Sequence, residues 1–162
     1  MKKTIAAAVV LIISLSTSSM TCGATDEAEF VRPDLIPTIE KISADYGVSP
    51  ELIEAMIETE SMGRSDVSNG SCVGLMQVST RYHSKRAKNL GVDLYSDAGN
   101  IRTGVDLLIE LSEDDDDLYY VLARYNGQRG AAPGKANSYA TKILDRAYEL
   151  ETVHGKHRYE SK

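Results

Sequence analysis

The sequence contains no tryptophan, one phenylalanine, two cysteines and four prolines among its 162 residues. Two cysteines are too few for the disulfide-rich scaffolds that stabilise many small exported proteins. Acidic residues outnumber basic ones by 24 to 18, so the chain lacks the concentrated positive charge that nucleic-acid binding requires. We therefore expect no nucleic acid partner. Hydrophobic residues make up 42% of the chain, which is typical of one globular domain of this length.

The longest apolar run, Ile5–Leu15, is too short to span a bilayer, which takes about 20 residues. It follows two lysines and precedes small polar residues, a pattern typical of a secretory signal peptide. We predict a signal peptide over residues 1–24, cleaved after its last residue, and export to the periplasm, the cell surface or the medium. Two alternatives stay open: an uncleaved anchor that continues through Met20, and lipid attachment at Cys22.

Cleavage would change both the charge and the thiol content of the chain. It would remove two lysines and no acidic residue, so the formal charge would fall from −6 to −8. Cys72 would then be the single cysteine, and no intramolecular disulfide could form. Because its neighbours are small and apolar, with no basic group nearby, we predict a buried inert thiol in preference to a nucleophile.

Apolar residues at three- and four-residue spacing predict a mainly α-helical, compact domain over residues 33–155. It follows a polar leader, residues 25–32, and precedes a flexible tail, residues 156–162. No run alternates with period two for long enough to predict a strand. The predicted helices cover residues 33–46, 50–60, about 101–111, 118–125 and about 138–150, with loops at 63–74 and 130–137.

One glutamate of the second predicted helix lies on an unexpected face. On a helical projection Glu60 falls within the apolar stripe, whereas Glu51, Glu54 and Glu58 fall on the opposite, polar side. Burial and the negative end of the helix dipole both favour the protonated form of Glu60. That is the form a general acid must hold near neutral pH. The alternative is a frayed last turn with Glu60 in solvent or paired with an arginine.

Short segments along the chain resemble the ordered motifs of a known family. They are Glu60-Ser61, Gly74-Leu75-Met76-Gln77, Asn100-Ile101 with Gly104, and Tyr125-Asn126. Their order resembles the catalytic domain of soluble lytic transglycosylases, a family related to goose-type lysozyme, over roughly residues 48–150. The resemblance implies a lysozyme-like helical fold with a substrate cleft. It also implies cleavage of peptidoglycan glycan strands between N-acetylmuramic acid and N-acetylglucosamine.

The resemblance implies a role for each matched residue, with simple packing as the alternative. Glu60 matches the family's single catalytic acid/base, which would protonate the glycosidic oxygen and then deprotonate the muramyl C6 hydroxyl, leaving a 1,6-anhydro end. The Tyr125 hydroxyl would orient Glu60. The residues implied in substrate binding or in lining the cleft are Ser68, Met76, Gln77, Tyr125 and Asn126.

The chain departs from the family pattern around the third motif. Arg124 precedes the tyrosine and Gly127-Gln128 follows the asparagine, where the family usually has alanine before and Ala-Gly after. We expect this difference to affect the shape of the sugar-binding subsites more than the cleavage reaction. With no tryptophan in the chain, stacking on sugars would fall to tyrosines such as Tyr82, Tyr95 or Tyr139.

The acidic and basic clusters have ordinary explanations. Counted from Asp114, the sixth and twelfth positions are tyrosines where an EF-hand needs glycine and glutamate. We predict instead a solvated turn that caps the helix starting at Leu118. Because the histidines are scattered, we expect no metal site, and we expect no cofactor. The basic cluster from Arg81 to Lys88 is either an exposed face or a contact for the anionic peptides of the substrate.

Two other functions remain open beside a lytic transglycosylase. One is a lysozyme-like hydrolase that uses the same acid with water, because cleft shape determines the access of water. The other is a non-catalytic module that binds the cell wall, against which the intact Glu60 argues. We expect the protein to act as a monomer.

Overall fold

The computed structural model describes residues 31–115, 117–127 and 138–160. The predicted signal peptide, most of the polar leader, the loop at 130–137 and the last two residues lie outside the described residues. The elements are η2 (Pro33–Leu35), α1 (Ile36–Tyr46), α2 (Pro50–Ser61), β1 (Ser68–Asn69), β2 (Cys72–Val73), β3 (Val78–Ser79), α3 (Thr80–Leu90), α4 (Asp97–Ser112), α5 (Leu118–Tyr125) and α6 (Ser138–Glu160). The predicted mainly helical fold is confirmed.

Several helix ends are fixed by residues that the sequence analysis identified. Gly47 ends α1 in the left-handed conformation, with φ of +69°. The Ser49 hydroxyl accepts a hydrogen bond from the Leu52 N–H at 3.4 Å and caps α2. The Asp117 carboxylate accepts one from the Tyr119 N–H at 2.9 Å, so the predicted cap of α5 by the acidic run is confirmed.

The small sheet was not predicted. Its three antiparallel strands, in the order β1-β2-β3, contain two residues each. Strands this short cannot show an alternation of polar and apolar side chains in the sequence. They lie within residues 68–79, part of which we predicted as a loop.

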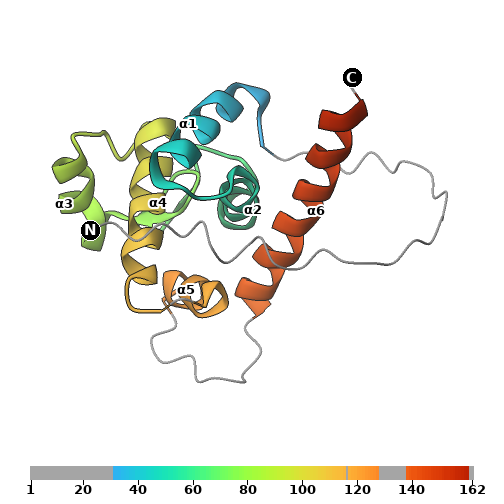
Figure 1. Ribbon diagram of the computed structural model, residues 1–162. Helices are drawn as coiled ribbons and strands as arrows, with labels where there is room; N and C mark the ends of the chain where they lie inside the picture. The colour runs from blue at the N-terminus through green and yellow to red at the C-terminus, as the bar shows by residue number, and fades with distance from the viewer. Residues whose placement is uncertain (1–30, 116, 128–137, 161–162) are drawn as a thin grey trace.

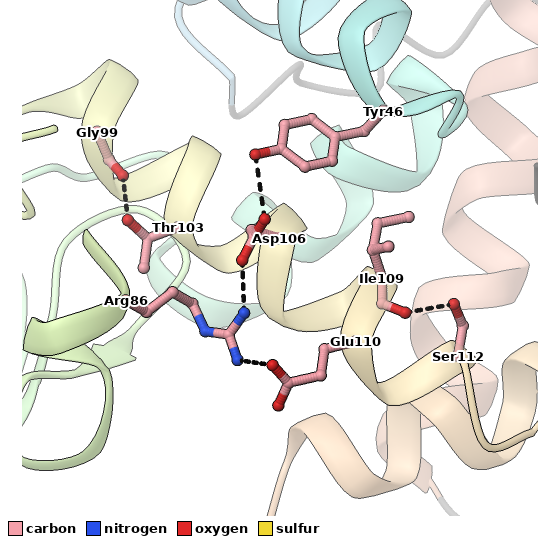
Figure 2. Close-up of polar contacts among 8 residues, drawn as sticks. All are labelled: Tyr46, Arg86, Gly99, Thr103, Asp106, Ile109, Glu110 and Ser112. Atoms are coloured by element: carbon pink, nitrogen blue, oxygen red, sulfur yellow. Dashed lines mark hydrogen bonds and ion pairs between the residues drawn. The ribbon is translucent and has the colours of Figure 1, made fainter. Parts of the chain in front are cut away.

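Helix α3 was also missed, because polar contacts hold it to the fold. Ala87 is its one fully buried residue. The Arg86 guanidinium donates to Asp106 of α4 at 2.5 Å and also to Glu110, and the Tyr46 hydroxyl of α1 donates to Asp106 at 3.3 Å (Figure 2). Arg86 therefore points inward, and only part of the predicted basic cluster is an exposed face. Hydrophobic periodicity cannot find a helix anchored in this way.

The prediction that three glutamates of α2 face solvent is wrong. The exposed fractions of Glu51, Glu54 and Glu58 are 5%, 5% and 9%. Helix α6 packs along this side of α2, and its first turns also lie beside α5 (Figure 1). A projection of α2 alone could not show that a later helix covers its charged side.

Helix α6 is longer than predicted. We expected the last helix to end near residue 150 and a flexible tail to begin at residue 156, but the helix continues to Glu160. Its inward face adds Ala140, Ile143, Ala147 and Leu150 to the core. None of the described helices is long and apolar enough to cross a membrane.

Candidate active site

Glu60 lies in the last turn of α2, just before Met62 adopts a left-handed conformation with φ of +55°. Its side chain is partly buried, and it forms no ion pair with any residue in the described part of the chain. The Tyr139 hydroxyl, from the first turn of α6, donates a hydrogen bond to Glu60 Oε1. Burial raises the pKa of Glu60 above its ordinary value, although the hydrogen bond from Tyr139 partly opposes this. Glu60 is therefore a carboxyl with an increased tendency to keep its proton.

The turn Gly74–Gln77 is fastened to α4 by Asn100, whose exposed fraction is 1%. The Asn100 side chain accepts from the Met76 N–H at 2.8 Å and donates to the carbonyls of Val73 and Leu94 at 2.9 and 3.1 Å. Gly74 has φ of +75°, and a Cβ there would lie 2.5 Å from the Asn100 amide nitrogen. The glycine therefore allows the turn to approach Asn100.

Tyr125, at the end of α5, does not make the contact we predicted. Its hydroxyl donates to the Met76 carbonyl at 3.0 Å, and the hydroxyl bonded to Glu60 belongs to Tyr139. Burial raises the pKa of Tyr125, and the charge of Glu60 raises it further. The effect of that charge means that Tyr125 lies near Glu60. A Cβ at Gly104 would lie 2.9 Å from the Tyr125 hydroxyl, so α4 packs directly against this tyrosine.

Two residues predicted to contact substrate are occupied within the protein. Met76 has an exposed fraction of 0% and packs on Gly104, so the prediction that it lines the cleft is wrong. The Gln77 side-chain nitrogen donates to the carbonyls of Val67 and Gly74 at 3.1 and 2.9 Å. The Gln77 side-chain nitrogen therefore helps to close the turn from Gly74 to Gln77.

The other predicted residues lie nearer the surface. Ser68 in β1 and Asn126 at the end of α5 are exposed. Tyr82 and Tyr95 are strongly exposed. Cys72 in β2 is a free thiol that is partly exposed, so the prediction of a buried thiol is wrong. It lies near enough to Tyr125 to contribute to the raised pKa of that residue.

The described residues place no metal cluster beside Glu60, and the hollow described below lies elsewhere. In residues 31–115, 117–127 and 138–160, no group of three His, Cys, Asp or Glu side chains could hold a metal ion. A surface hollow of about 410 Å³ lies between α1 and α4, lined by Lys41 and Arg102 among others, and Glu60 is not part of it. The predicted substrate cleft at Glu60 stays a prediction.

Sequence reasoning missed the part that Tyr139 plays. Tyr139 was considered only as a stacking surface, because 79 positions separate it from Glu60 in the sequence. The sequence signal was weak, namely a tyrosine in the first turn of an amphipathic helix. Asn100 was noticed as part of a motif, but its three hydrogen bonds to the turn could not be inferred from spacing.

A partly buried carboxyl at the end of a central helix, in a compact and mainly α-helical domain, defines a lysozyme-like protein. The family model of the transglycosylase SLT domain matches residues 37–148, and the chain belongs to this family of lytic transglycosylases. The chain is also 33% identical over 111 residues to a protein named "Transglycosylase" from Enterobacteria phage PRD1. That match covers 66% of this chain and 40% of the phage protein, so the chain spans less than half of its relative's length.

Proposed function

We propose that this protein is a peptidoglycan lytic transglycosylase with Glu60 as its single catalytic acid and base. One observation carries the proposal: Glu60 is partly buried, has a raised pKa and is hydrogen-bonded by Tyr139. A carboxyl that keeps its proton near neutral pH can donate it to a leaving oxygen. Membership of the transglycosylase SLT domain family supplies the substrate class.

The reaction uses the same carboxyl twice. Glu60 first donates its proton to the glycosidic oxygen between N-acetylmuramic acid and N-acetylglucosamine, and the bond from this oxygen to muramyl C1 breaks. The substrate's acetamido group supports the positive charge that develops at C1. The Glu60 carboxylate then takes the proton of the muramyl C6 hydroxyl as O6 attacks C1. A 1,6-anhydro ring forms, Glu60 is protonated again, and no water is consumed.

This sequence of steps explains why one carboxyl can suffice. Hydrolytic glycosidases generally use a second carboxylate to activate water or to form a covalent intermediate. Glu58 is the nearest carboxyl along α2, but both of its oxygens accept hydrogen bonds from Arg146. It is therefore committed to the α2–α6 interface.

Substrate contacts would come from the exposed groups of the matched motifs. Ser68 on β1 and Asn126 after α5 are exposed and carry hydrogen-bonding side chains. The Gln77 side-chain oxygen can accept a hydrogen bond from a sugar hydroxyl while its nitrogen holds the turn. Met76, which is buried, and Tyr125, which is partly buried, would act indirectly by supporting this surface.

The proposed substrate also supports the predicted export. Peptidoglycan lies outside the cytoplasmic membrane, and the N-terminal sequence pattern is typical of a secretory signal peptide. We therefore place the protein in the periplasm, at the cell surface or in the medium.

The test is digestion of purified peptidoglycan followed by mass spectrometry of the released fragments. Fragments with 1,6-anhydromuramic ends are expected, each lighter by one water than the hydrolytic product. Glu60→Gln should lower the rate by about 10³-fold or more, because the general acid is lost. Glu40→Gln, which alters an exposed glutamate of α1, is the matched control and should keep the wild-type rate.

Two results would contradict this proposal. Reducing ends in place of anhydro ends would show a hydrolase that uses the same acid. A Glu60→Gln protein with the wild-type rate would show that another group is the acid.

A further inference from the structure

Three of the contacts that the structure describes join α6 to carboxyl groups of α2. The Tyr139 hydroxyl donates to Glu60, the Arg146 guanidinium to Glu58, and the His154 ring lies 3.1 Å from Glu51. The contacts follow opposite orders along the two helices, so the chain runs in opposite senses along α2 and α6 where they meet. Each contact therefore constrains how far α6 can slide along α2.

The central contact has the most directional geometry. Arg146 Nε lies 2.6 Å from Glu58 Oε2, and its Nη2 lies 3.2 Å from Oε1, so the guanidinium holds both carboxylate oxygens. The two side chains are 17% and 9% exposed. A two-point bond of this kind fixes rotation as well as distance. The apolar contacts of α6, by contrast, gain little from any one orientation.

Arg146 and Tyr139 share one face of α6. They are seven residues apart, which is close to two helical turns and about 10 Å along the axis. Because Tyr139 lies in the first turn of α6, the position of its hydroxyl relative to Glu60 depends on how α6 docks on α2. Of the other two described contacts, the bond from Arg146 to Glu58 lies nearer to Tyr139 along α6 than the contact of His154 with Glu51. It is therefore the contact that most directly constrains the position of Tyr139.

We propose that Arg146 is a positioning residue of the active site, which pairs with Glu58 to hold α6 in register and so keeps the Tyr139 hydroxyl on Glu60. The inference rests on the proposed function of Glu60. Glu58 neutralises the arginine, so that the pair can fix α6 without placing an unbalanced positive charge beside the catalytic carboxyl. The described side-chain contacts of Arg146 are with Glu58 and Glu149 and do not include Glu60.

The decisive variant is Glu58→Leu/Arg146→Met, which removes both charges together and retains most of the side-chain volume. Replacing a buried ion pair with apolar residues is often neutral or favourable for folding, so the variant should fold. We expect kcat to fall about five- to tenfold, the loss expected from one misplaced hydrogen bond, with KM little changed. A purely structural pair would leave kcat unchanged.

A double-mutant comparison identifies the route of this effect. Tyr139→Phe should lower kcat in the wild-type background but cause no further loss in the Glu58→Leu/Arg146→Met background, because the hydroxyl is already displaced. Arg146→Lys keeps the positive charge but cannot form the two-point bond of the guanidinium, so its kcat should lie between those of the wild type and the double variant. If Tyr139→Phe lowers kcat by the same factor in both backgrounds, the proposal is overturned, since Arg146 would then act independently of Tyr139.

The His154→Gln variant is the matched control. It removes the contact at the far end of the interface, and it should lower the melting temperature while leaving kcat and its pH profile unchanged. Equal losses of kcat in both variants would also contradict the specific role of Arg146.

A measurement that needs no activity separates this inference from the proposed function. Carbon-13 NMR can follow the titration of the Glu60 carboxyl in each protein. Loss of the hydrogen bond from Tyr139 should raise the Glu60 pKa further in the double variant, as in Tyr139→Phe. If the wild type fails to cleave peptidoglycan, the proposed function fails, and this shift still tests the positioning role. An unchanged titration would overturn it.

Discussion

Glu58 and Glu60 lie two residues apart on α2, and α6 contacts both, yet their surroundings differ in kind. Glu58 meets a guanidinium that neutralises its charge. Glu60 meets a neutral phenol, and burial raises its pKa. One helix therefore carries, two residues apart, a carboxyl paired with a cation and a carboxyl with a raised pKa. What separates them is the partner that α6 presents, because both are glutamates in the same helix.

The comparison is tested most strongly by giving Glu60 the kind of partner that Glu58 has. Tyr139→Lys would place an ammonium group near Glu60 and lower its pKa, because a nearby positive charge favours the carboxylate. We expect the rate at neutral pH to fall by about 100-fold, within the range attributed to general acid catalysis. The measurement is the pH–rate profile, and an unchanged rate near neutrality would contradict the role of the protonated form.

The reverse change leaves Glu58 without its partner. Arg146→Met would keep a buried carboxylate and remove the cation, so we expect a loss of about 2 kcal/mol in the free energy of unfolding. This is less than is typical of fully buried pairs, because Arg146 is partly exposed. Chemical denaturation at neutral pH measures it, with Lys142→Met on the exposed side of α6 as the control. Equal stability of the two variants would show that the pair contributes little.

A smaller change removes only the hydrogen bond at Glu60. Tyr139→Phe should lower kcat about tenfold, the equivalent of one such bond. Since the bond lowers the pKa of Glu60, its loss should raise that pKa, and the alkaline limb of the pH–rate profile should move to higher pH. A limb that moves to lower pH would show that Tyr139 excludes water from Glu60 more than it bonds to it.

The smallest effect concerns the stability contributed by two carboxyls with opposite pKa shifts. Burial raises the pKa of Glu51, but hydrogen bonds from its own backbone N–H, Ser49 and His154 outweigh burial and lower the pKa below its ordinary value of 4.5. Its contribution is therefore present above pH 4.5 and lost as pH falls through the lowered pKa. Glu60 has a raised pKa, so ionising it costs stability above that pKa.

Two glutamine variants should therefore differ in sign near neutral pH. Glu51→Gln should destabilise the protein there, and Glu60→Gln should stabilise it slightly, each by about 1 kcal/mol or less. Both differences should shrink in acid. Thermal melts from pH 3 to 7 measure them, and the same sign for both variants would contradict the opposite shifts.

Local patterns predicted much of the fold and one residue of the candidate site. Gly47, Ser49 and Asp117 act within a few residues of their own positions, so their effects on helix ends could be recognised in the sequence. The unexpected position of Glu60 on the α2 projection was likewise a local feature. What failed was long-range: α6 covers the charged side of α2, and Tyr139 reaches Glu60 from a helix far along the chain.

Motif matching identified which residues belong to the candidate site, but it did not predict the burial or the hydrogen-bond partners of their side chains. It identified Met76, Gln77 and Tyr125 as residues of the site, but it could not show that Met76 is buried or that Tyr125 bonds to a backbone carbonyl. Asn100 holds the backbone of this turn in place through hydrogen bonds to Met76 and Val73. Such contacts depend on three-dimensional proximity, which the spacing of residues in the sequence does not encode.

The late position of α6 in the chain has a consequence for when the site can exist. Synthesis delivers a polypeptide from its N-terminus, so Glu60 is made long before Tyr139 and Arg146. An unfinished or truncated chain that ends before α6 would possess the acid without the residues that hold it in place. The carboxyl and the residues that contact it would thus come together only after α6 has been made and has folded against α2.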